Sequence, residues 1–375
     1  MQVLILAAGK GSRMASLTQS NHKSLLPINE NDSFLSHLLH QLNEYQLSKV
    51  VIVTGYLSEL VKKVVDEYQM RIQIVYNNKY EIDTNIYSMK IGLDYLSNEE
   101  PIVIFEADTY IDDLALKKIM NESEKNRSLW FTKGNFKPNQ YGGILRDDKD
   151  LNISDIQIVS EYNDKFKEYK KLLGIQTIGS NEINFYKSQI DIYVKKTIEQ
   201  YYLIPWIDNL DELPSLSCDL SEFMIESVNN EKEYISFISK LKEKENKNLV
   251  EISLVSIKKL LPIEDYIKER VDLLFNEISN SNWWTKPIVV DIENFLILDG
   301  HHRFQVAKKL KLKKIPVVFT KYSDVEVWSL RKSEHVDVTT VIKRAKKNNI
   351  YPNKTVKHIF KFSVPHCKIK ISNLK

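Results

Sequence analysis

The beginning of the chain carries residues whose types and spacing suit the binding of a triphosphate. Gly9 and Gly11 follow an apolar run, and Arg13 comes two residues later. Small residues let backbone N–H groups approach a ligand closely, and successive amides in such a turn form a concave anion site. Lys23 adds a second cation, and two cations together with amides suit a leaving pyrophosphate. We predict a nucleotide-binding site made of Leu6, Ala7, Ala8, Gly9, Gly11, Ser12, Arg13 and Lys23.

Asp108 stands at the end of a second apolar run, PIVIFEA. In open α/β sheets, ligands bind at the carboxyl ends of the strands, and Mg²⁺ usually takes one or two carboxylates plus substrate phosphates. We therefore predict that Asp108 is a ligand of Mg²⁺. The spacing G-x-G-x-R matches neither the dinucleotide-binding fingerprint nor the P-loop, which disfavours both. An ordinary strand-to-helix turn is the alternative interpretation of the two glycines.

A second group of such residues is the run from Asp299 to Arg303, DGHHR. Gly300 permits a tight turn before a helix that we expect to begin near His302. At a helix N-terminus, free amides and the helix dipole favour an anion, and Arg303 can bind a phosphate through two hydrogen bonds. We predict a phosphate site here, with Asp299 as a metal ligand or base. Zinc binding by the two histidines and a purely structural histidine pair are the alternatives.

The elements that must position the first group are short β-branched runs alternating with longer amphipathic segments, as far as about residue 110. This rhythm is typical of an α/β fold with a parallel sheet and helices on both faces. Further strands are expected at 141–145, 153–159 and 173–179. The charged segment 239–248 indicates the end of a solvent-facing helix or a linker.

After this segment the pattern restarts, which predicts a second, smaller α+β domain. We expect strands or hairpins at 249–257, 287–298 and 314–320, and helices at 265–280 and 302–312, whereas the tail after residue 321 is short and strand-like. The predicted domains are residues 1–245 and 246–375.

Composition limits the class of partner. The 375 residues include 53 basic and 50 acidic ones, a net charge of +3, so no strong field favours nucleic acid or a membrane as the main partner. Small molecules are expected instead. The two cysteines, Cys218 and Cys367, make neither a metal cluster nor a disulfide framework. No apolar run is long enough to cross a bilayer, and the apolar start lacks the basic region of a signal peptide, so we expect a cytoplasmic protein.

The motifs LAAGKGSRM, KSLLP and EAD resemble those of the sugar-phosphate and phosphocholine nucleotidyltransferase family, over about residues 1–235. Within it, YNNKYEIDTNIYSM is similar to the short cytidylyltransferases for phosphocholine and related small phosphoesters. The resemblance implies a Rossmann-like domain in which Arg13 and Lys23 hold the triphosphate of CTP and Asp108 holds the metal.

The same resemblance implies that Asn85 and Ser88 lie close to the nucleotide, with a helix cap as the alternative. The family usually has a second metal-binding Asp near the end of this domain. Our alignment places Asn229 there, and an amide is a poorer ligand of Mg²⁺ than a carboxylate.

DGHHRFQVA, with its flanking strands, resembles the ParB/sulfiredoxin-like domain and specifically its free L-serine kinase branch, over about residues 249–362. The resemblance implies that Glu264 accepts the proton of the serine hydroxyl and that Asp299 assists proton transfer or holds Mg²⁺. The turn implied to hold the nucleotide phosphates is Gly300, His301, His302 and Arg303. The element YPNKTVKHIF implies a site for serine or phosphoserine lined by Lys354, Thr355 and His358.

The two implied activities are consecutive, because a kinase makes the phosphate monoester that a nucleotidyltransferase consumes. We predict a bifunctional enzyme that phosphorylates free L-serine with ATP or ADP and couples the phosphoserine with CTP, giving CDP-L-serine and pyrophosphate. One alternative is a phosphocholine or phosphoethanolamine cytidylyltransferase fused to another small-alcohol kinase. Another is a CTP-binding ParB-like regulatory module as the second domain. Trp283 and Trp284 are expected to pack at a domain or subunit contact, and a homodimer is one arrangement left open.

Overall fold

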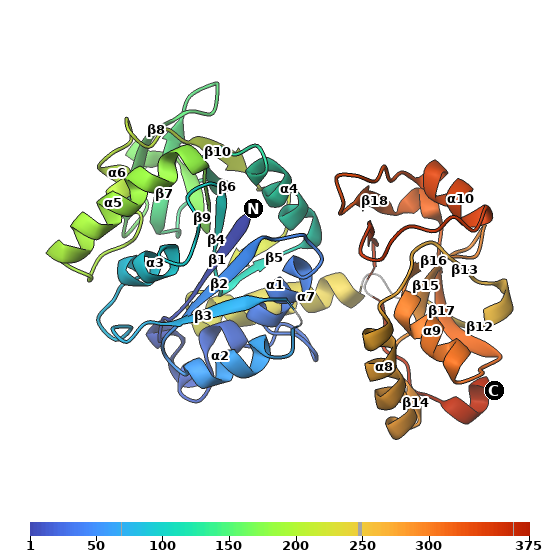
Figure 1. The fold of residues 1–375 in the computed structure, drawn as a ribbon. Helices are drawn as coiled ribbons and strands as arrows, with labels where there is room; N and C mark the ends of the chain where they lie inside the picture. Colours follow the sequence, from blue (N-terminus) through green and yellow to red (C-terminus); the bar gives the residue numbers. More distant parts are fainter. Residues whose placement is uncertain (69, 247–249, 363) are drawn as a thin grey trace. The chain divides into compact units, whose positions relative to one another are not determined.

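The computed structural model describes residues 1–68, 70–246, 250–362 and 364–375. The chain divides into two compact units, Met1–Ser239 (unit 1) and Lys240–Lys375 (unit 2) (Figure 1). The division falls within helix α7, Glu231–Asn246, six residues before the boundary that the sequence suggested. The charged segment is therefore helical up to residue 246, and residues 247–249, where we expected its end and the start of the next strand, lie outside the described residues.

A nine-stranded sheet forms the centre of unit 1, with the order β10-β6-β9-β4-β1-β2-β3 and with β7 and β8 attached beside β9. Neighbours among β1 to β4 pair in parallel, which confirms the predicted parallel sheet, whereas β9 is antiparallel to both β4 and β6. The strands are β1 (Gln2–Ala7), β2 (Lys49–Thr54), β3 (Ile72–Tyr76), β4 (Ile102–Glu106), β6 (Leu129–Asn135), β7 (Gly142–Asp147), β8 (Ile153–Val159), β9 (Lys170–Ile178) and β10 (Leu216–Asp219).

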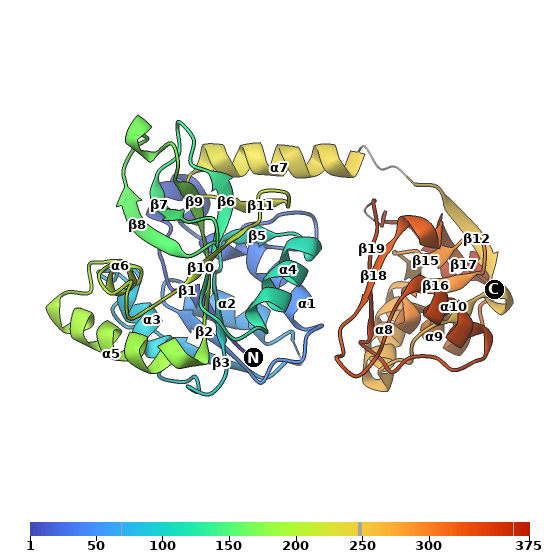
Figure 2. The ribbon, with the colours of Figure 1, turned by 90° about the horizontal axis from the view of Figure 1, so that it is seen from above.

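Helices cover both faces of this sheet, with α3 and α5 on one side and α1 and α4 on the other (Figures 1 and 2). Side chains alternate along β1, so that Val3 and Ile5 join one buried cluster, with α1, α2 and α4, while Leu4 and Leu6 join another, with α3, α5 and α6. The α-helices of this part of the chain are α1 (Phe34–Leu42), α2 (Ser58–Val65), α3 (Ile86–Leu93), α4 (Asp113–Ser123), α5 (Ser180–Lys196) and α6 (Ile204–Ile207).

A short antiparallel pair completes unit 1. β5 (Thr109–Ile111) pairs with β11 (Ile225–Ser227), and Thr109 lies opposite Ser227. The residues just before β5 and just after β11 are thereby brought to the same edge of the unit, although they are far apart in the sequence. The remaining 3₁₀ segments of the unit are η1 (Ser12–Thr18), η2 (Lys23–Leu25) and η3 (Asp164–Phe166).

Unit 2 contains a five-stranded sheet with the order β12-β17-β15-β16-β13. β15 and β16 form the predicted hairpin, and β17 pairs in parallel with β15. Two further antiparallel pairs are β14 with β20 and β18 with β19. The strands are β12 (Ile252–Ser256), β13 (Leu261–Pro262), β14 (Trp283–Trp284), β15 (Ile288–Asp291), β16 (Leu296–Asp299), β17 (Lys314–Thr320), β18 (Glu326–Ser329), β19 (Val356–Ile359) and β20 (Ile369–Lys370).

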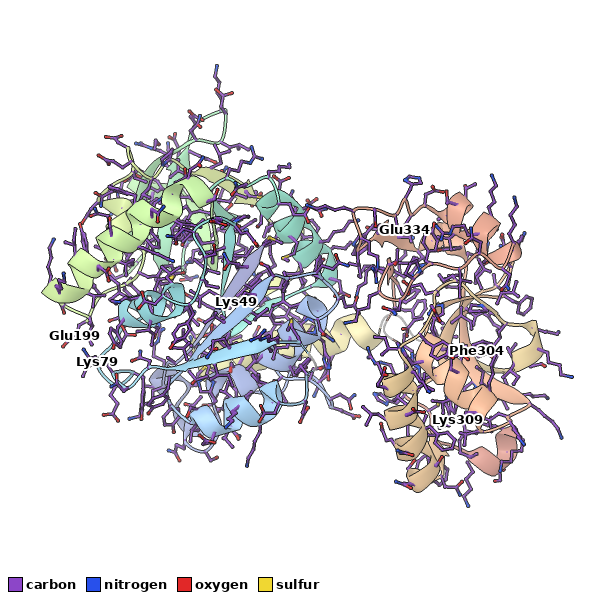
Figure 3. The ribbon with its side chains drawn as sticks, viewed as in Figure 1. Lys49, Lys79, Glu199, Phe304, Lys309 and Glu334 are labelled. Carbon is purple, nitrogen blue, oxygen red and sulfur yellow. The ribbon has the colours of Figure 1, made fainter. Side chains whose placement is uncertain are left out.

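Three helices pack on the core of unit 2. Phe304 of α9 is buried in the interior of the unit (Figure 3), and Trp284 is fully buried in the same cluster. Trp284 therefore packs within its own unit. The α-helices are α8 (Lys268–Ser281), α9 (His301–Lys309) and α10 (Val338–Lys346), and the 3₁₀ segments are η4 (Ile257–Lys259), η5 (Tyr322–Asp324) and η6 (Ile371–Leu374).

The tail after residue 321 differs from the strand-like segment that the sequence suggested. β18 and β19 are present, but α10 lies between them. Its buried residues, Val341 and Ala345, are four positions apart and so lie on one helix face. In the described part of the chain, no helix combines the length and the apolar character needed to span a membrane.

Candidate functional site

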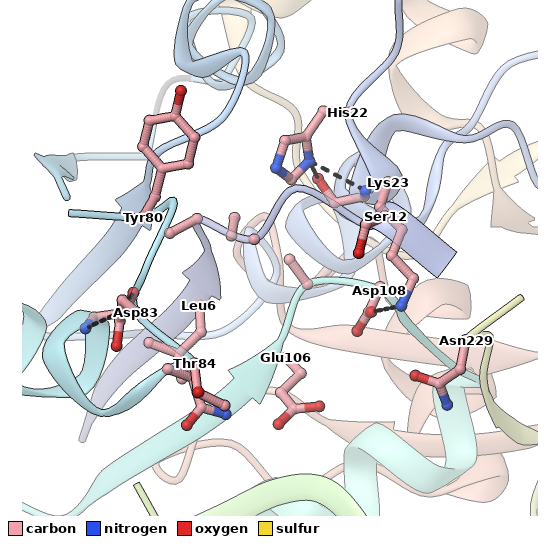
Figure 4. Close-up of a pocket in the computed structure, with 18 of the residues that line it drawn as sticks. Leu6, Ser12, His22, Lys23, Tyr80, Asp83, Thr84, Glu106, Asp108 and Asn229 are labelled. Atoms are coloured by element: carbon pink, nitrogen blue, oxygen red, sulfur yellow. Dashed lines mark hydrogen bonds and ion pairs between the residues drawn. The ribbon is translucent and has the colours of Figure 1, made fainter. Parts of the chain in front are cut away.

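A pocket of about 290 Å³ lies at the carboxyl ends of β1 and β4 in unit 1 (Figure 4). These strands are parallel neighbours, so the segments that follow them meet at one edge of the sheet. The pocket gathers every residue that the sequence predicted for the nucleotide and metal sites of the first domain: Leu6, Ala7, Ala8, Gly9, Gly11, Ser12, Arg13, Lys23, Asn85, Ser88 and Asp108.

The glycine loop turns sharply between β1 and η1. Gly11 has φ +64° in the left-handed region, and its carbonyl accepts the N–H of Met14 at 2.9 Å and the hydroxyl of Thr18 at 3.0 Å. A Cβ on Gly11 would lie 3.1 Å from the Cβ of Lys23, whereas a Cβ on Gly9 would meet no atom within 4 Å. Gly11 is therefore needed for the turn itself, and Gly9 keeps the pocket side of the loop open.

Lys23 and Asp108 form an ion pair across the pocket (Figure 4). The pair is largely enclosed, with 11% and 23% of the two side chains exposed. His22 holds the segment that carries Lys23, because its Nδ1 accepts the N–H of Ser24 at 3.2 Å and caps η2. Burial lowers the pKa of His22 to about 4, so the ring stays neutral and remains an acceptor. His22 was not predicted from the sequence as a site residue.

Asn229 lines the same pocket, close to Arg13, whose Nη2 donates to its Oδ1 at 3.4 Å. The pairing of β5 with β11 explains this position, because it brings the residues that follow Ser227 close to Asp108. Glu226, three residues earlier, is ion-paired with Lys133 at 2.7 Å. Glu226 does not line the pocket, so the oxygens that meet there are those of the Asn229 amide and the Asp108 carboxylate, both of the kind that Mg²⁺ accepts.

Ser88 belongs to a hydrogen-bond network centred on Asp83, whereas Asn85 is bonded to Tyr202. The Asp83 carboxylate accepts the N–H groups of Tyr87 at 2.9 Å and Ser88 at 2.8 Å and the Ser88 hydroxyl at 2.7 Å. Asn85 stands at the N-cap position of α3 but makes no capping bond, and its Oδ1 accepts the N–H of Tyr202 at 2.8 Å. The cap of α3 is therefore Asp83, which the sequence analysis missed although it lines the pocket.

Glu106 is a further pocket residue that the sequence analysis passed over, although EAD was singled out as a motif. It ends β4 two residues before Asp108. Burial raises the pKa of its carboxyl well above the usual range, and the charge of Asp108 acts in the same direction. The hydroxyl of Tyr202 donates to Glu106 at 3.4 Å. The pocket thus contains a second acidic residue, which forms no ion pair among the described residues.

In unit 2, the DGHHR turn has the predicted form, with α9 beginning at His301. Gly300 has φ +97°, and a Cβ there would lie 2.5 Å from Ile288, so only glycine fits. Arg303 donates to Asp299 at 2.7 Å in an ion pair. The predicted phosphate ligand Arg303 and the predicted metal ligand or base Asp299 are therefore paired with each other in the structure.

The two histidine rings make contacts that the sequence analysis did not anticipate. Nε2 of His301 accepts the N–H groups of Ile263 at 3.2 Å and Glu264 at 3.3 Å. Nε2 of His302 accepts the N–H of Ile267 at 3.1 Å. Burial lowers the pKa of each ring to about 4. These contacts give no support to the prediction that both rings bind phosphate, because neutral rings occupied as acceptors hold the segment 263–267 in place.

Glu264 is fixed at both ends. Its Oε1 accepts the N–H groups of Thr355 at 2.5 Å and Val356 at 2.6 Å, and its backbone forms a parallel bridge with Tyr351. Backbone N–H donors favour the ionised carboxylate. The structure thus brings together Glu264 and Thr355, which the sequence assigned to separate motifs.

The other residues predicted for serine binding differ in their surroundings. Thr355 is fully buried, and its hydroxyl has no partner among the described residues. His358 is buried with one ring nitrogen 2.8 Å from the hydroxyl of Tyr322 and the other bonded to the Leu298 carbonyl. Lys354 has φ +53° and lies near enough to lower the pKa of His302 by its charge. Thr355 is therefore the member of this set with a free hydrogen-bonding group.

Metal binding by protein residues alone finds no support in the described part of the chain, which contains no cluster of three or more His, Cys, Asp or Glu able to hold an ion. Sites that share a metal with substrate phosphates need fewer protein ligands. The oxygens of Asp108 and Asn229 fit such a site in unit 1.

Comparison with known proteins matches the two parts of the chain to two different families. Residues 2–200 match the nucleotidyl transferase family, and residues 239–335 match the ParB N-terminal domain. A solved structure of CTP:phosphocholine cytidylyltransferase from Streptococcus pneumoniae has a similar fold, with a TM-score of 0.54 over 64% of this chain and 98% of that protein, at 22% identity.

Two curated relatives are similar to different parts of the sequence. Choline-phosphate cytidylyltransferase of Haemophilus influenzae is 39% identical over 98 residues, which cover 26% of this chain and 41% of that protein. ATP-dependent L-serine kinase of Staphylothermus marinus is 35% identical over 82 residues, 21% of this chain and 32% of that protein. The chain thus spans less than half the length of either relative. Because the nucleotidyl transferase match covers more than half of the sequence and the pocket fits it, the chain belongs to the nucleotidyl transferase family and carries a ParB N-terminal domain after it.

Proposed function

We propose that this chain is a bifunctional transferase. Unit 2 phosphorylates free L-serine to O-phospho-L-serine, and unit 1 couples that phosphoserine with CTP to give CDP-L-serine and pyrophosphate. The observation that carries the proposal is the pocket of unit 1, where the glycine loop, Lys23 and Asp108 meet. The similarity of one segment to cytidylyltransferases and of another to an L-serine kinase supports the choice of substrates.

In unit 1, a phosphate oxygen of the acceptor attacks the α-phosphorus of CTP, the bond to the bridging oxygen of the β-phosphate breaks, and pyrophosphate leaves with that oxygen. The amides of the glycine loop, Arg13 and Lys23 bind the triphosphate and compensate the charge that gathers on the leaving group. Asp108 and Asn229 would hold Mg²⁺, which supplies further positive charge to the phosphates when bound. Asn85, held by Tyr202, is available to the nucleoside from the wall of the pocket.

In unit 2, the serine hydroxyl oxygen attacks the terminal phosphorus of ATP or ADP, and its proton passes to Glu264. The bond from that phosphorus to the bridging oxygen breaks, and ADP or AMP leaves with that oxygen. The two backbone N–H groups that bind Glu264 hold its carboxylate in the orientation for this role. Thr355, whose backbone N–H binds Glu264, is proposed to lie next to the serine site, with its buried hydroxyl free of partners among the described residues. Arg303 is available to the phosphates once it exchanges its partner Asp299 for them.

The test is ³¹P NMR of the full chain with L-serine, Mg²⁺ and either ATP or ADP, followed by addition of CTP. We expect a phosphoserine signal first and a CTP-dependent diphosphodiester signal second. Glu264→Gln should remove the first signal and spare the second when phosphoserine is supplied, and Lys23→Ala should do the reverse. Absence of phosphoserine with both donors would refute the kinase assignment.

Phosphocholine is a second candidate acceptor for unit 1, because the similarity to choline-phosphate cytidylyltransferase covers part of this domain. Competition between phosphoserine and phosphocholine at equal concentration in the same reaction decides between them. A product that contains only choline would assign unit 1 to that acceptor and leave the kinase assignment to its own test.

A further inference from the structure

Glu264, the base proposed for unit 2, is held by a turn from a distant part of the chain. The two amides that bind its carboxylate belong to Thr355 and Val356, at the beginning of β19. Lys354, directly before them, has φ +53°. Residues other than glycine rarely adopt this left-handed conformation unless the contacts around them hold it. The contacts that fix this turn therefore also fix the direction from which the two N–H groups reach Glu264.

β18 holds the turn from one side. β18 and β19 are antiparallel neighbours (Figure 2), and the last residues that they pair are Ser329 and Val356. Beyond that pair, the N–H of Leu330 donates to the carbonyl of Thr355 at 2.7 Å. Among the described residues, this is the final backbone hydrogen bond between the two segments before the chain reaches Lys354.

Arg331 continues the contact with its side chain. Its Nη2 donates to the carbonyl of Asn353 at 2.7 Å, and that carbonyl belongs to the peptide bond that leads into Lys354. The backbone of Arg331 is itself fixed, because the hydroxyl of Ser329 accepts its N–H at 3.1 Å and donates to its carbonyl at 2.8 Å. The turn is therefore held before Lys354 by Arg331 and after it by Leu330.

The surroundings of Arg331 are unusual for an arginine that only stabilises a loop. The side chain is half-buried, its Nε is buried without an acceptor, and it forms no ion pair among the described residues. Arg344, in the same connection between β18 and β19, is instead paired with Glu334 at 2.9 Å. Because a partly buried charge without a partner is costly, stability alone does not account for an arginine at position 331.

We propose that Arg331 is a positioning residue for serine phosphorylation. By fixing the turn at Lys354, it directs the two N–H groups that orient the carboxylate of Glu264. The inference rests on the proposed kinase activity of unit 2 and adds a residue outside the motifs DGHHR and YPNKTVKHIF. Arg331 acts through the backbone and needs no contact with either substrate. Without it, the turn is free to leave its conformation, and the base loses its alignment with the serine hydroxyl.

Three variants distinguish this role from direct contact with a substrate. Arg331→Met removes the donor to Asn353, Arg331→Lys keeps a charged donor, and Arg331→Gln keeps a donor without charge. Asp337→Ala is the matched control, because its carboxylate caps α10 by accepting the N–H of Thr340 at 2.9 Å and its hydroxyl at 2.6 Å. The control weakens the same connection between β18 and β19 but lies outside the turn at Lys354.

Amide hydrogen exchange of the full chain is the first measurement, because it does not depend on enzyme activity. Exchange at Thr355 and Val356 reports the hydrogen bonds to Glu264. In Arg331→Met we expect these two amides to exchange about tenfold faster, relative to the amides of β15, than in the unaltered chain. Arg331→Gln and Arg331→Lys should lie in between, and Asp337→Ala should leave the ratio unchanged.

Steady-state kinetics of serine phosphorylation are the second measurement. In Arg331→Met, kcat should fall by about tenfold to a hundredfold because the base is misplaced. The KM values for L-serine and the nucleotide should change by less than about threefold, because Arg331 touches neither substrate. Arg331→Gln and Arg331→Lys should restore part of kcat. Asp337→Ala should lower the melting temperature through the lost cap and keep kcat. If Arg331→Met fails to fold, the other two variants carry the same comparison.

Unchanged exchange at Thr355 and Val356 in Arg331→Met would overturn the proposal, and so would an equal increase in Asp337→Ala. A raised KM for L-serine with equal losses in Arg331→Met and Arg331→Gln would also overturn it, because the guanidinium would then bind the substrate itself. If the unaltered chain phosphorylates no serine but exchange follows the expected pattern, the proposed kinase activity fails while the hold of Arg331 on Glu264 is supported. The two proposals are therefore separated by the two measurements.

Discussion

Nε2 of His301 accepts the backbone N–H of Glu264 at 3.3 Å. The residue proposed to take the serine proton is thus anchored by a ring from the start of α9, 37 residues further along the chain. A ring nitrogen that accepts a hydrogen bond carries no proton, which agrees with the lowered pKa of His301. His301, the first histidine of DGHHR, therefore holds the segment around Glu264 in place within unit 2.

Replacing His301 with Phe should remove the acceptor of two backbone N–H groups and leave them unpaired. We expect the free energy of unfolding to fall by about 1–3 kcal/mol for each group and the kcat of serine phosphorylation to fall more than its KM rises, because Glu264 loses its position. Urea unfolding and steady-state kinetics measure the two effects. His301→Gln, which offers an acceptor oxygen, should restore part of both; a loss of nucleotide affinity alone would instead indicate a phosphate ligand.

His358 should make stability depend on pH. Burial lowers its pKa to about 3, so the fold favours the neutral ring and the unfolded chain binds the additional proton. Its contribution is complete above about pH 6.5 and is lost as the pH falls toward the folded pKa, with a slope of up to about 1.4 kcal/mol per pH unit. Urea unfolding at several pH values should show a smaller acid loss in His358→Gln. Identical slopes in the two chains would contradict this role.

The two glycines of the pocket loop should respond differently to alanine. Gly11→Ala places a side chain at φ +64° against Lys23, which costs about 1–2 kcal/mol of folding free energy. Gly9→Ala meets no atom, so the melting temperature should not change, whereas CTP binding should weaken by about tenfold because a methyl group separates ligand and amides. Thermal unfolding and calorimetry separate the effects. Unaltered CTP binding in Gly9→Ala would mean that the phosphates bind elsewhere.

Asp108→Asn should separate metal use from nucleotide binding. Chelation of Mg²⁺ should stop pyrophosphate release by the unaltered chain, and in Asp108→Asn the Mg²⁺ concentration for half-maximal release should rise by about tenfold or more, because a carboxylate ligand is lost. Without metal, the variant should bind CTP at least as tightly, since Lys23 no longer has Asp108 as its partner. Weaker metal-free binding would show that Asp108 supports the pocket structurally.

The parallel part of unit 1 could be predicted because each buried strand is an apolar run with turn residues behind it. Pocket-lining residues that closely follow such strands, such as Gly9 and Asp108, were predictable for the same reason. Glu106 was not predicted as a site residue. It is the last residue of β4, and within the motif EAD only Asp108 was given a role. Its position beside Gly174 and Tyr202, which are distant in the sequence, follows only from the fold.

The contacts of unit 2 were harder to predict because they join segments far apart in the chain. From its residue type and position alone, a histidine at a helix start could equally bind a phosphate or accept hydrogen bonds from a neighbouring segment. Only the fold shows that the rings of His301 and His302 face backbone N–H groups of residues 263–267. In the same way, the position of Asn85 suggested that it caps α3. The cap is Asp83 instead, because its carboxylate accepts three hydrogen bonds from α3.

The hydrogen-bond partners of Glu264 also affect the order in which the two units fold during synthesis. Its carboxylate is bound by an amide 91 residues further along the chain, whereas the pocket of unit 1 is complete once residue 229 has been made. Domains fold largely as units and N-terminal ones first during synthesis, and distant contacts form slowly. The nascent chain therefore completes the nucleotidyl transferase unit before the ParB-like unit, and a ribosome stalled after α10 would leave Glu264 without the amides that hold its carboxylate.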